Sequence, residues 1–171
     1  KPKPEPPKPG SYEAEDVPIF ISISSFRDRL CPVTLFNIFT KAQFRDRIAV
    51  SVIQQNDHAL DVDCYDEYCK MMKDKFHKVK GGNSGDEQYI CPYADNIQVL
   101  RVKSSEAKGP QWARSLGSEM LQRAFHAAEE YADNAAGAAT EDPTTNLLKG
   151  PWASLTASQS FCMQIDSHMD F

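Results

Sequence analysis

Short apolar runs alternate with amphipathic segments along this chain of 171 residues. Four runs carry apolar residues on successive positions, the pattern of strands whose two faces are both covered. They are Pro18 to Ser24, Arg47 to Ile53, Ile97 to Val102 and Phe161 to Ile165. We therefore predict a sheet of four strands.

Helical periodicity appears between these runs. Leu35, Ile38, Phe39 and Ala42 repeat at helical spacing within Thr34 to Ala42, and a second helix is predicted from Cys64 to His77. The longest pattern begins at Pro110, a residue suited to a first helical turn, and places Ala113, Leu116, Met120, Ala124, Ala127 and Tyr131 on one stripe. Strands separated by helices predict an α/β fold with a central, mostly parallel sheet flanked by helices.

The length is that of one domain. Residues 1–16 open with five prolines among charges and are predicted to be an extended linker or stem, which leaves 17–171 for the folded domain. Gly81 to Asp86 is a connector, and residues 132–160 lack a clear period, which predicts a surface insertion.

Composition excludes several classes of function. The net charge of −5 and the absence of a basic patch argue against nucleic acid as a partner. No apolar run approaches the roughly 20 residues of a membrane span. Glycine-rich dinucleotide and phosphate-loop motifs are absent, as is the Gly-x-Ser-x-Gly elbow of hydrolases.

Cysteine usage leaves the compartment open. The chain has five cysteines, of which Cys64 and Cys69 are spaced too widely for a zinc knuckle. One disulfide involving Cys64, Cys69 or Cys91 suits an oxidising lumen, whereas buried free thiols suit the cytosol.

Polar residues gather where each predicted strand ends. In parallel α/β sheets ligands bind beyond the carboxyl ends of the strands, so these clusters are expected to meet at one edge. The clusters are Ser24, Ser25, Arg27 and Asp28; Asn56 and Asp57; Ser104 and Glu106; and Asp166 with His168. Their side chains suit an activated phosphate or sugar.

Asp166 and His168 are predicted to face the same side, so both could ligate one divalent cation and leave its other positions open to phosphate oxygens. The competing interpretation is a solvated loop. Arg114 lies one turn into the helix that starts at Pro110, where the helix N-terminus already favours an anion, although an ordinary surface arginine fits as well.

Two further residues have competing interpretations. Arg27 suits bidentate binding of a phosphate, or a surface ion pair with Asp28 or Glu106. Asp57 suits a hydrogen bond to a base or ribose, or the turn chemistry of Asn56-Asp57.

These stretches together resemble a family, the GlcNAc-type glycosyltransferases, whose best-known members modify hydroxyproline on a ubiquitin-ligase subunit. The matching stretches are Ile19 to Asp28, Val52 to Asp57, Leu100 to Val102, Glu106 to Arg114 and Gln164 to His168. They follow one another in the order found in the family.

The resemblance implies a GT-A nucleotide-sugar-binding fold, UDP-N-acetylglucosamine (UDP-GlcNAc) as donor and a divalent metal, Mn²⁺, as cofactor. Asp166-Ser167-His168 stands where the family carries its Asp-x-Asp-like motif, which implies that Asp166 and His168 hold the metal. Ser24, Ser25, Arg27 and Asp28 would line the uridine side, Asp57 would flank the base, and Gly109 and Arg114 would approach the diphosphate or sugar.

The implied reaction is metal-dependent transfer of GlcNAc to an acceptor hydroxyl on a protein or glycan, hydroxyproline included, with retained anomeric configuration. Arg114 and Asp166 would be the catalytic residues. The family's domain continues past the metal motif, so the chain is expected to cover the donor-binding part. The alternative is a non-catalytic GT-A-like interaction module, and both a cytoplasmic and a Golgi-lumenal location remain open.

Overall fold

The protein is described here by a computed structural model that covers residues 17–77, 89–134, 150–155 and 160–166. Its centre is a four-stranded, all-parallel sheet in the order β3-β2-β1-β4. The strands are β1 (Ile19–Phe26), β2 (Ile48–Asn56), β3 (Ile97–Lys103) and β4 (Phe161–Asp166). The predicted α/β class and the parallel sheet are confirmed.

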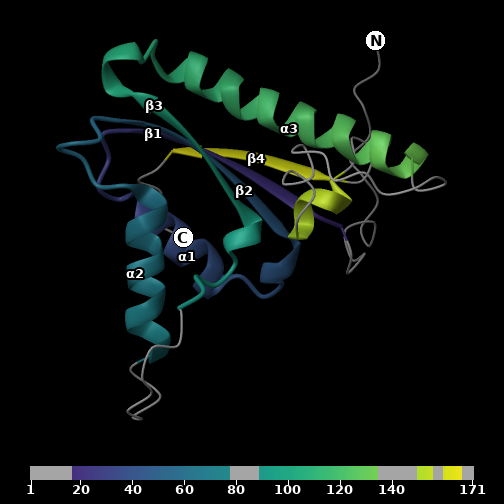
Figure 1. Cartoon of the computed structure of the whole chain (residues 1–171), viewed down its shortest axis with the longest axis horizontal. Coiled ribbons are helices and arrows are strands. Elements are labelled where there is room, and N and C mark those ends of the chain that lie inside the picture. The colour runs from purple at the N-terminus through teal and green to yellow at the C-terminus, as the bar shows by residue number, and fades with distance from the viewer. Residues whose placement is uncertain (1–16, 78–88, 135–149, 156–159, 167–171) are drawn as a thin grey trace, which may run out of the picture.

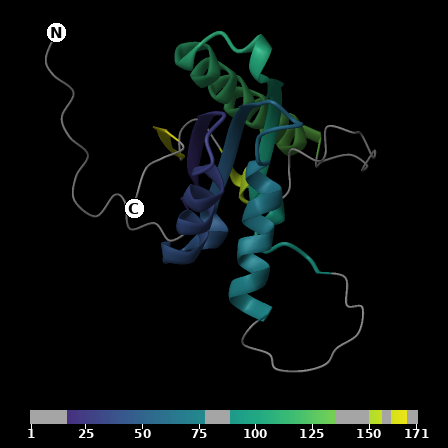
Figure 2. The ribbon, with the colours of Figure 1, turned by 90° about the vertical axis from the view of Figure 1, so that its left-hand side faces the viewer.

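Helices cover both faces of the sheet (Figure 1). Two of them, α1 (Cys31–Lys41) and α2 (Cys64–His77), run side by side on one face, as Figure 2 shows, and α3 (Pro110–Asn134) crosses the other face. All three helices were predicted, and α2 has the predicted bounds. Within the described ranges, no helix combines the length and apolar character of a membrane span.

The core lies in two layers because side chains alternate across each strand. On the side of α1 and α2, strand residues such as Ile23 and Val52 pack with Leu35, Phe39 and Tyr68, all fully buried. On the side of α3, a smaller cluster contains Phe20, Ala49, Ala124, Trp152 and Leu155. Both faces of the central strands β1 and β2 are therefore covered.

Trp152 and Leu155 come from the segment that was predicted to be a surface insertion. Residues 150–155 instead join the core: Gly150–Ser154 forms a 3-10 helix, both side chains are fully buried, and the Trp152 indole donates to the Asn96 carbonyl at 3.2 Å. Residues 132–134 belong to α3, while 135–149 and 156–159 lie outside the described residues, as do the predicted connector and the linker at 1–16.

Two disulfides hold the α1 and α2 side together. Cys31 pairs with Cys64, which joins the first residues of α1 and α2, and Cys69 pairs with Cys91, which joins α2 to the segment before β3. Cys162 on β4 is free and exposed. Of the two alternatives for the cysteines, the structure has the disulfide one, with two bonds instead of one. Disulfides persist in oxidising compartments.

Asp63 fixes the start of α2 against the sheet. Its Oδ1 accepts the backbone N–H groups of Tyr65 and Asp66, and its Oδ2 accepts hydrogen bonds from Gln54 at 2.9 Å and Arg101 at 2.7 Å. Burial alone raises the pKa of this carboxyl, but the hydrogen bonds from Arg101, the Asp66 N–H and Gln54 outweigh it and hold the pKa at about 2. An ionised Asp63 thus ties α2 to β2 and β3.

Candidate functional site

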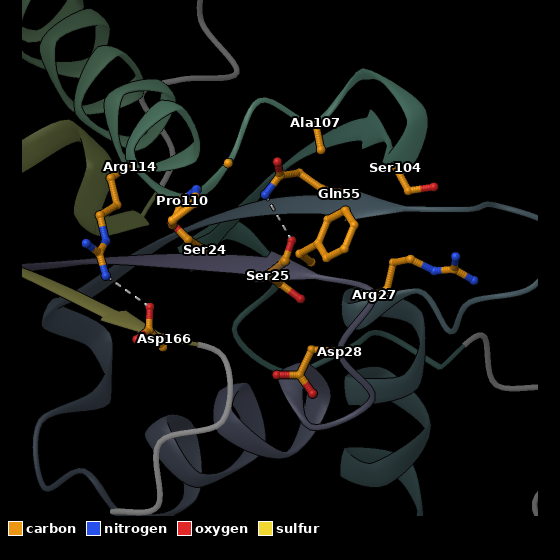
Figure 3. A pocket seen from close by; sticks show the side chains of 12 residues that line it. Ser24, Ser25, Arg27, Asp28, Gln55, Ser104, Ala107, Pro110, Arg114 and Asp166 are labelled. Carbon is orange, nitrogen blue, oxygen red and sulfur yellow. Dashed lines mark hydrogen bonds and ion pairs between the residues drawn. The ribbon is translucent and has the colours of Figure 1, made fainter.

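The carboxyl ends of the strands and the N-terminus of α3 surround a cavity of about 750 Å³ (Figure 3). It opens at the edge of the sheet where parallel α/β folds bind ligands. Its walls are formed by Ser24, Ser25, Phe26, Arg27, Asp28, Gln55, Ser104, Ala107, Gly109, Pro110, Arg114 and Asp166. Members of the polar clusters after β1, β3 and β4 therefore share one cavity, whereas Asn56, Asp57 and Glu106 do not line it.

The exit of β1 contributes the largest group of lining residues, including Ser24, Ser25 and Asp28. Asp28 stands between β1 and α1, and its Oδ1 accepts the N–H of Leu30 at 2.8 Å. This hydrogen bond shapes the turn into α1 and leaves the carboxylate at the wall of the cavity.

Arg27 lines the cavity, but its guanidinium is already engaged. Its backbone adopts φ 52° and its N–H donates to the Gln55 carbonyl at 3.2 Å, which turns the chain away from the sheet. Its Nε lies 2.9 Å from Oδ2 of Asp61, and Figure 3 shows the side chain extending away from Arg114 and Asp166. The ion pair expected with Asp28 or Glu106 is thus made with Asp61, whose pKa is lowered by the Asp57 N–H and by Arg27.

Asp57 is not among the residues that line the cavity. Its Oδ1 accepts the N–H of Ala59 at 3.0 Å, and its own N–H donates to Asp61 at 2.7 Å. These are the contacts of a turn, which was the alternative to a role beside the base. The carboxylate of Asp57 therefore stabilises the loop after β2, and Asp61 of the same loop pairs with Arg27.

The N-terminus of α3 forms another part of the cavity wall. Gly109 has φ +92°, a conformation that L side chains rarely adopt, and it turns the chain so that Pro110 begins the helix at the cavity. The first backbone bond of the helix runs from the Ala113 N–H to the Gly109 carbonyl at 3.2 Å. Unpaired N–H groups and the helix dipole make such an end favourable for an anion.

Arg114 and Asp166 meet at the same wall. Nη2 of Arg114 donates to Oδ1 of Asp166 at 3.3 Å, and the two side chains are 37% and 45% exposed. Because both remain accessible from the cavity, they present a cation and a carboxylate side by side to a ligand (Figure 3).

Of the two residues implied as metal ligands, Asp166 lies among the described residues. Asp166 offers carboxylate oxygens at the cavity wall, and Mn²⁺ or Mg²⁺ sites use one or two carboxylates completed by phosphates and water. His168 lies outside the described residues, and among those described no cluster of three or more His, Cys, Asp or Glu side chains is found. The donor set therefore fits an ion that a bound diphosphate helps to coordinate.

Four lining residues were not among the sequence-based candidates: Phe26, Gln55, Ala107 and Pro110. Two of them carry functional side chains: Phe26 ends β1 and is 56% exposed, and Gln55 lies on β2 and is 3% exposed. The one available signal was a run of two glutamines inside an otherwise apolar strand. That signal does not separate Gln54, which binds Asp63, from Gln55, which lines the cavity.

The arrangement can bind a phosphorylated ligand. Arg114 and the N-terminus of α3 attract anions at one side, a carboxylate beside them can hold a cation, and an aromatic ring with polar neighbours lies at the exits of β1 and β2. A nucleotide has a flat ring at one end and phosphates at the other, so its chemistry matches both sides of the cavity.

Comparison with known proteins supports this assignment. The family model described as Glycosyltransferase (GlcNAc) matches residues 18–131, which is more than half of the chain and ends before Asp166. No curated protein and no solved structure matches. With the all-parallel sheet, the flanking helices and the cavity at the strand ends, this match shows that the chain belongs to the GlcNAc glycosyltransferase family.

Proposed function

We propose that this cavity binds UDP-GlcNAc and that the protein transfers GlcNAc from it to an acceptor hydroxyl. The observation that carries the proposal is the convergence of the β1, β2 and β4 ends with the N-terminus of α3 around one cavity, in a chain of this family. Membership of the family by itself indicates a glycosyltransferase. The proposal adds the identity of the donor, UDP-GlcNAc.

Arg114 has the central role in this mechanism. The guanidinium stands at the wall where the diphosphate is expected, and it forms hydrogen bonds with phosphate oxygens as readily as with the Asp166 carboxylate that it now contacts. When the bond between the anomeric carbon and the β-phosphate oxygen breaks, negative charge grows on UDP. Arg114 and the N–H groups of α3 stabilise this charge.

The metal proposal assigns Asp166 and His168 as the protein ligands of Mn²⁺. When bound, the ion supplies Lewis-acid stabilisation of the departing diphosphate. Arg114 holds the Asp166 carboxylate in place, and this carboxylate would hold the ion beside the diphosphate.

The acceptor oxygen forms the new bond to the anomeric carbon, and the departing diphosphate receives the acceptor proton. This course retains the configuration and requires no separate general base. We propose a protein or glycan hydroxyl as acceptor, hydroxyproline included. The two disulfides favour acceptors in an oxidising compartment, such as the Golgi lumen, over cytosolic ones.

Calorimetric titration with UDP-GlcNAc, with and without Mn²⁺, tests the donor and the metal together. We expect the wild type to bind UDP-GlcNAc more tightly when Mn²⁺ is present. The affinity of Asp166→Ala for UDP-GlcNAc should be the same with and without Mn²⁺. Asp95→Ala is the matched control, because Asp95 is exposed and precedes β3 at the opposite edge of the sheet, so it should behave as the wild type.

Release of UDP in the presence of acceptor candidates then tests transfer. Binding without any release of UDP contradicts the catalytic proposal and favours the non-catalytic interaction module. Absence of binding by every nucleotide sugar removes the proposed donor site altogether.

A further inference from the structure

Phe26 and Gln55 are direct neighbours among the residues that line the cavity. They are paired across the β1–β2 ladder, so their side chains point to the same face of the sheet. That face is the one covered by α3, and both residues line the cavity. An exposed phenyl ring and a buried carboxamide therefore stand side by side where a ligand enters.

The carboxamide of Gln55 has a fixed orientation. Its Nε2 donates to the backbone carbonyl of Ser25 at 3.4 Å. Reversing the amide would bring its oxygen against that carbonyl, so the hydrogen bond determines which end of the group faces Ser25. Figure 3 shows the nitrogen turned toward Ser25 and the oxygen turned away from it.

Among the described residues, the oxygen of this carboxamide has no hydrogen-bond partner. Gln55 is 3% exposed, and its Oε1 is among the buried side-chain atoms of the described residues that accept no hydrogen bond. A buried acceptor that lacks a hydrogen bond destabilises a protein. A ligand that brings an N–H group to this oxygen recovers that free energy.

Gln54, the preceding residue, shows that the strand can give both polar side-chain atoms of a buried glutamine a hydrogen-bond partner. Its Nε2 donates to Asp63 at 2.9 Å and its Oε1 accepts the N–H of Cys64 at 2.7 Å. Gln54 therefore links β2 to α2 on the other face of the sheet, whereas Gln55 keeps an acceptor free on the face of the cavity.

A ligand that satisfies both neighbours needs a flat ring for Phe26 and an N–H donor in the plane of that ring for Gln55. Aromatic side chains stack on nucleobases, and this stacking stabilises the bound base. Uracil has such an N–H at N3. Cytosine has an unprotonated nitrogen at that position, and its lone pair would face the lone pairs of the glutamine oxygen.

We propose that Oε1 of Gln55 accepts the N3–H of a uracil ring stacked on Phe26, and that this bond selects uridine over cytidine nucleotides. The inference rests on the proposed function, because it places the base of the nucleotide sugar. It adds a residue that determines base specificity and an aromatic residue that contributes to binding without distinguishing pyrimidines.

The first test compares UDP, 3-methyl-UDP and CDP by calorimetric titration of the wild-type chain. Methylation of N3 removes the donor and leaves the ring, ribose and phosphates unchanged. We expect UDP to bind on the order of 10- to 100-fold more tightly than the other two, since a buried acceptor is left unpaired in both weaker complexes.

The second test uses Gln55→Met, which keeps the length of the side chain and removes the acceptor. Its expected effect is weaker binding of UDP, with the three ligands within about threefold of one another, since the difference in hydrogen bonding is gone. Gln98→Met on β3 is the matched control, because Gln98 is half-buried and does not line the cavity, and it should keep the wild-type preference. Phe26→Leu should weaken UDP and CDP by a similar factor of about 10.

The outcomes separate this inference from the proposed function. Equal binding of UDP, 3-methyl-UDP and CDP by the wild type overturns the role of Gln55 and leaves a nucleotide site in place. Tighter binding of GDP than of UDP overturns the choice of uracil. If no nucleotide binds, both proposals are wrong. The comparison of UDP with 3-methyl-UDP needs no variant, so it decides the matter even if Gln55→Met fails to fold.

Discussion

Arg114, one turn into α3, donates a hydrogen bond to Asp166, the last residue of β4, across 52 positions of sequence. The contact closes one wall of the cavity and joins two segments that no local pattern connects. Because the pair is partly exposed, its contribution to stability is small, at about 0–1 kcal/mol. Its proposed importance lies in binding and transfer.

Arg114→Gln should therefore impair transfer much more than folding. We expect the rate of GlcNAc transfer to fall by about 100-fold or more, the size of effect seen when one preorganised donor to a developing negative charge is lost. The measurement is UDP release under saturating donor, with thermal unfolding alongside it.

Arg123→Gln is the control for this variant. Arg123 lies on the same helix, its side chain is 72% exposed, and it pairs only loosely with Glu119 at 4.0 Å. Full activity of Arg114→Gln, or an equal loss in Arg123→Gln, contradicts the role given to Arg114.

Gly117→Ala should destabilise the fold. A Cβ at this position of α3 would overlap the Ser22 hydroxyl and lie 3.2 Å from the Ser22 Cβ. Alanine gains up to about 1 kcal/mol of helix propensity over glycine, but overpacking a tight interface costs about 1–3 kcal/mol. We expect a net loss of about 1 kcal/mol in urea denaturation.

The double variant Gly117→Ala with Ser22→Gly identifies the cause. Removing the Ser22 side chain clears the space for the new methyl group. Ser22→Gly should therefore lower the free energy of unfolding by less in the Gly117→Ala background than in the wild type. Simple additivity of the two effects would mean that α3 does not pack on β1 as closely as we describe.

Breaking the disulfide between Cys31 and Cys64 should lower the free energy of unfolding by about 3–4 kcal/mol. The bond closes a loop across a sequence separation of 33, and cross-links of this span constrain the unfolded chain to that extent. Chemical denaturation of Cys31→Ser/Cys64→Ser measures the loss, with Cys162→Ser as control because Cys162 is free and exposed. Alkylation of the denatured, unreduced wild type should label Cys162 alone.

The stability of the protein should fall between about pH 4 and pH 2 through Asp63. The pKa of its carboxyl is about 2 in the folded protein and 3.8 ordinarily, so the folded state favours the ionised form. The contribution of Asp63 is present above pH 4 and is lost as the pH falls through 2. A shift of this size corresponds to about 2 kcal/mol.

Asp63→Asn is the variant that isolates this effect. Asparagine can still cap α2 through its side-chain oxygen, but it carries no charge for Arg101 and does not titrate. The loss of stability between pH 4 and pH 2.5 should be smaller in Asp63→Asn than in the wild type. Parallel curves for the two proteins would contradict the assignment of this titration to Asp63.

Local pattern predicted the elements well because their causes are local. A central parallel strand such as Ile48–Asn56 needs a continuous apolar run, and a helix such as Cys64–His77 needs apolar residues at intervals of three and four. The observed strand boundaries differ from the predicted ones where polar residues extend an apolar strand. Thus β2 continues through Gln54, Gln55 and Asn56, whose side chains are buried and hydrogen-bonded within the fold.

The sequence by itself determined the α/β class, the helices and the edge of the sheet at which polar groups collect, since parallel strands bring their carboxyl ends together. The tertiary structure decided which groups share the cavity. In the folded protein Arg27 pairs with Asp61, and the Asp57 side chain stabilises a turn. Arg114 contacts Asp166, and among the described residues the side-chain oxygen of Gln55, but not that of Gln54, lacks a hydrogen bond. These outcomes depend on contacts between residues far apart in the chain, whose distances only the packing of helices on the sheet can set.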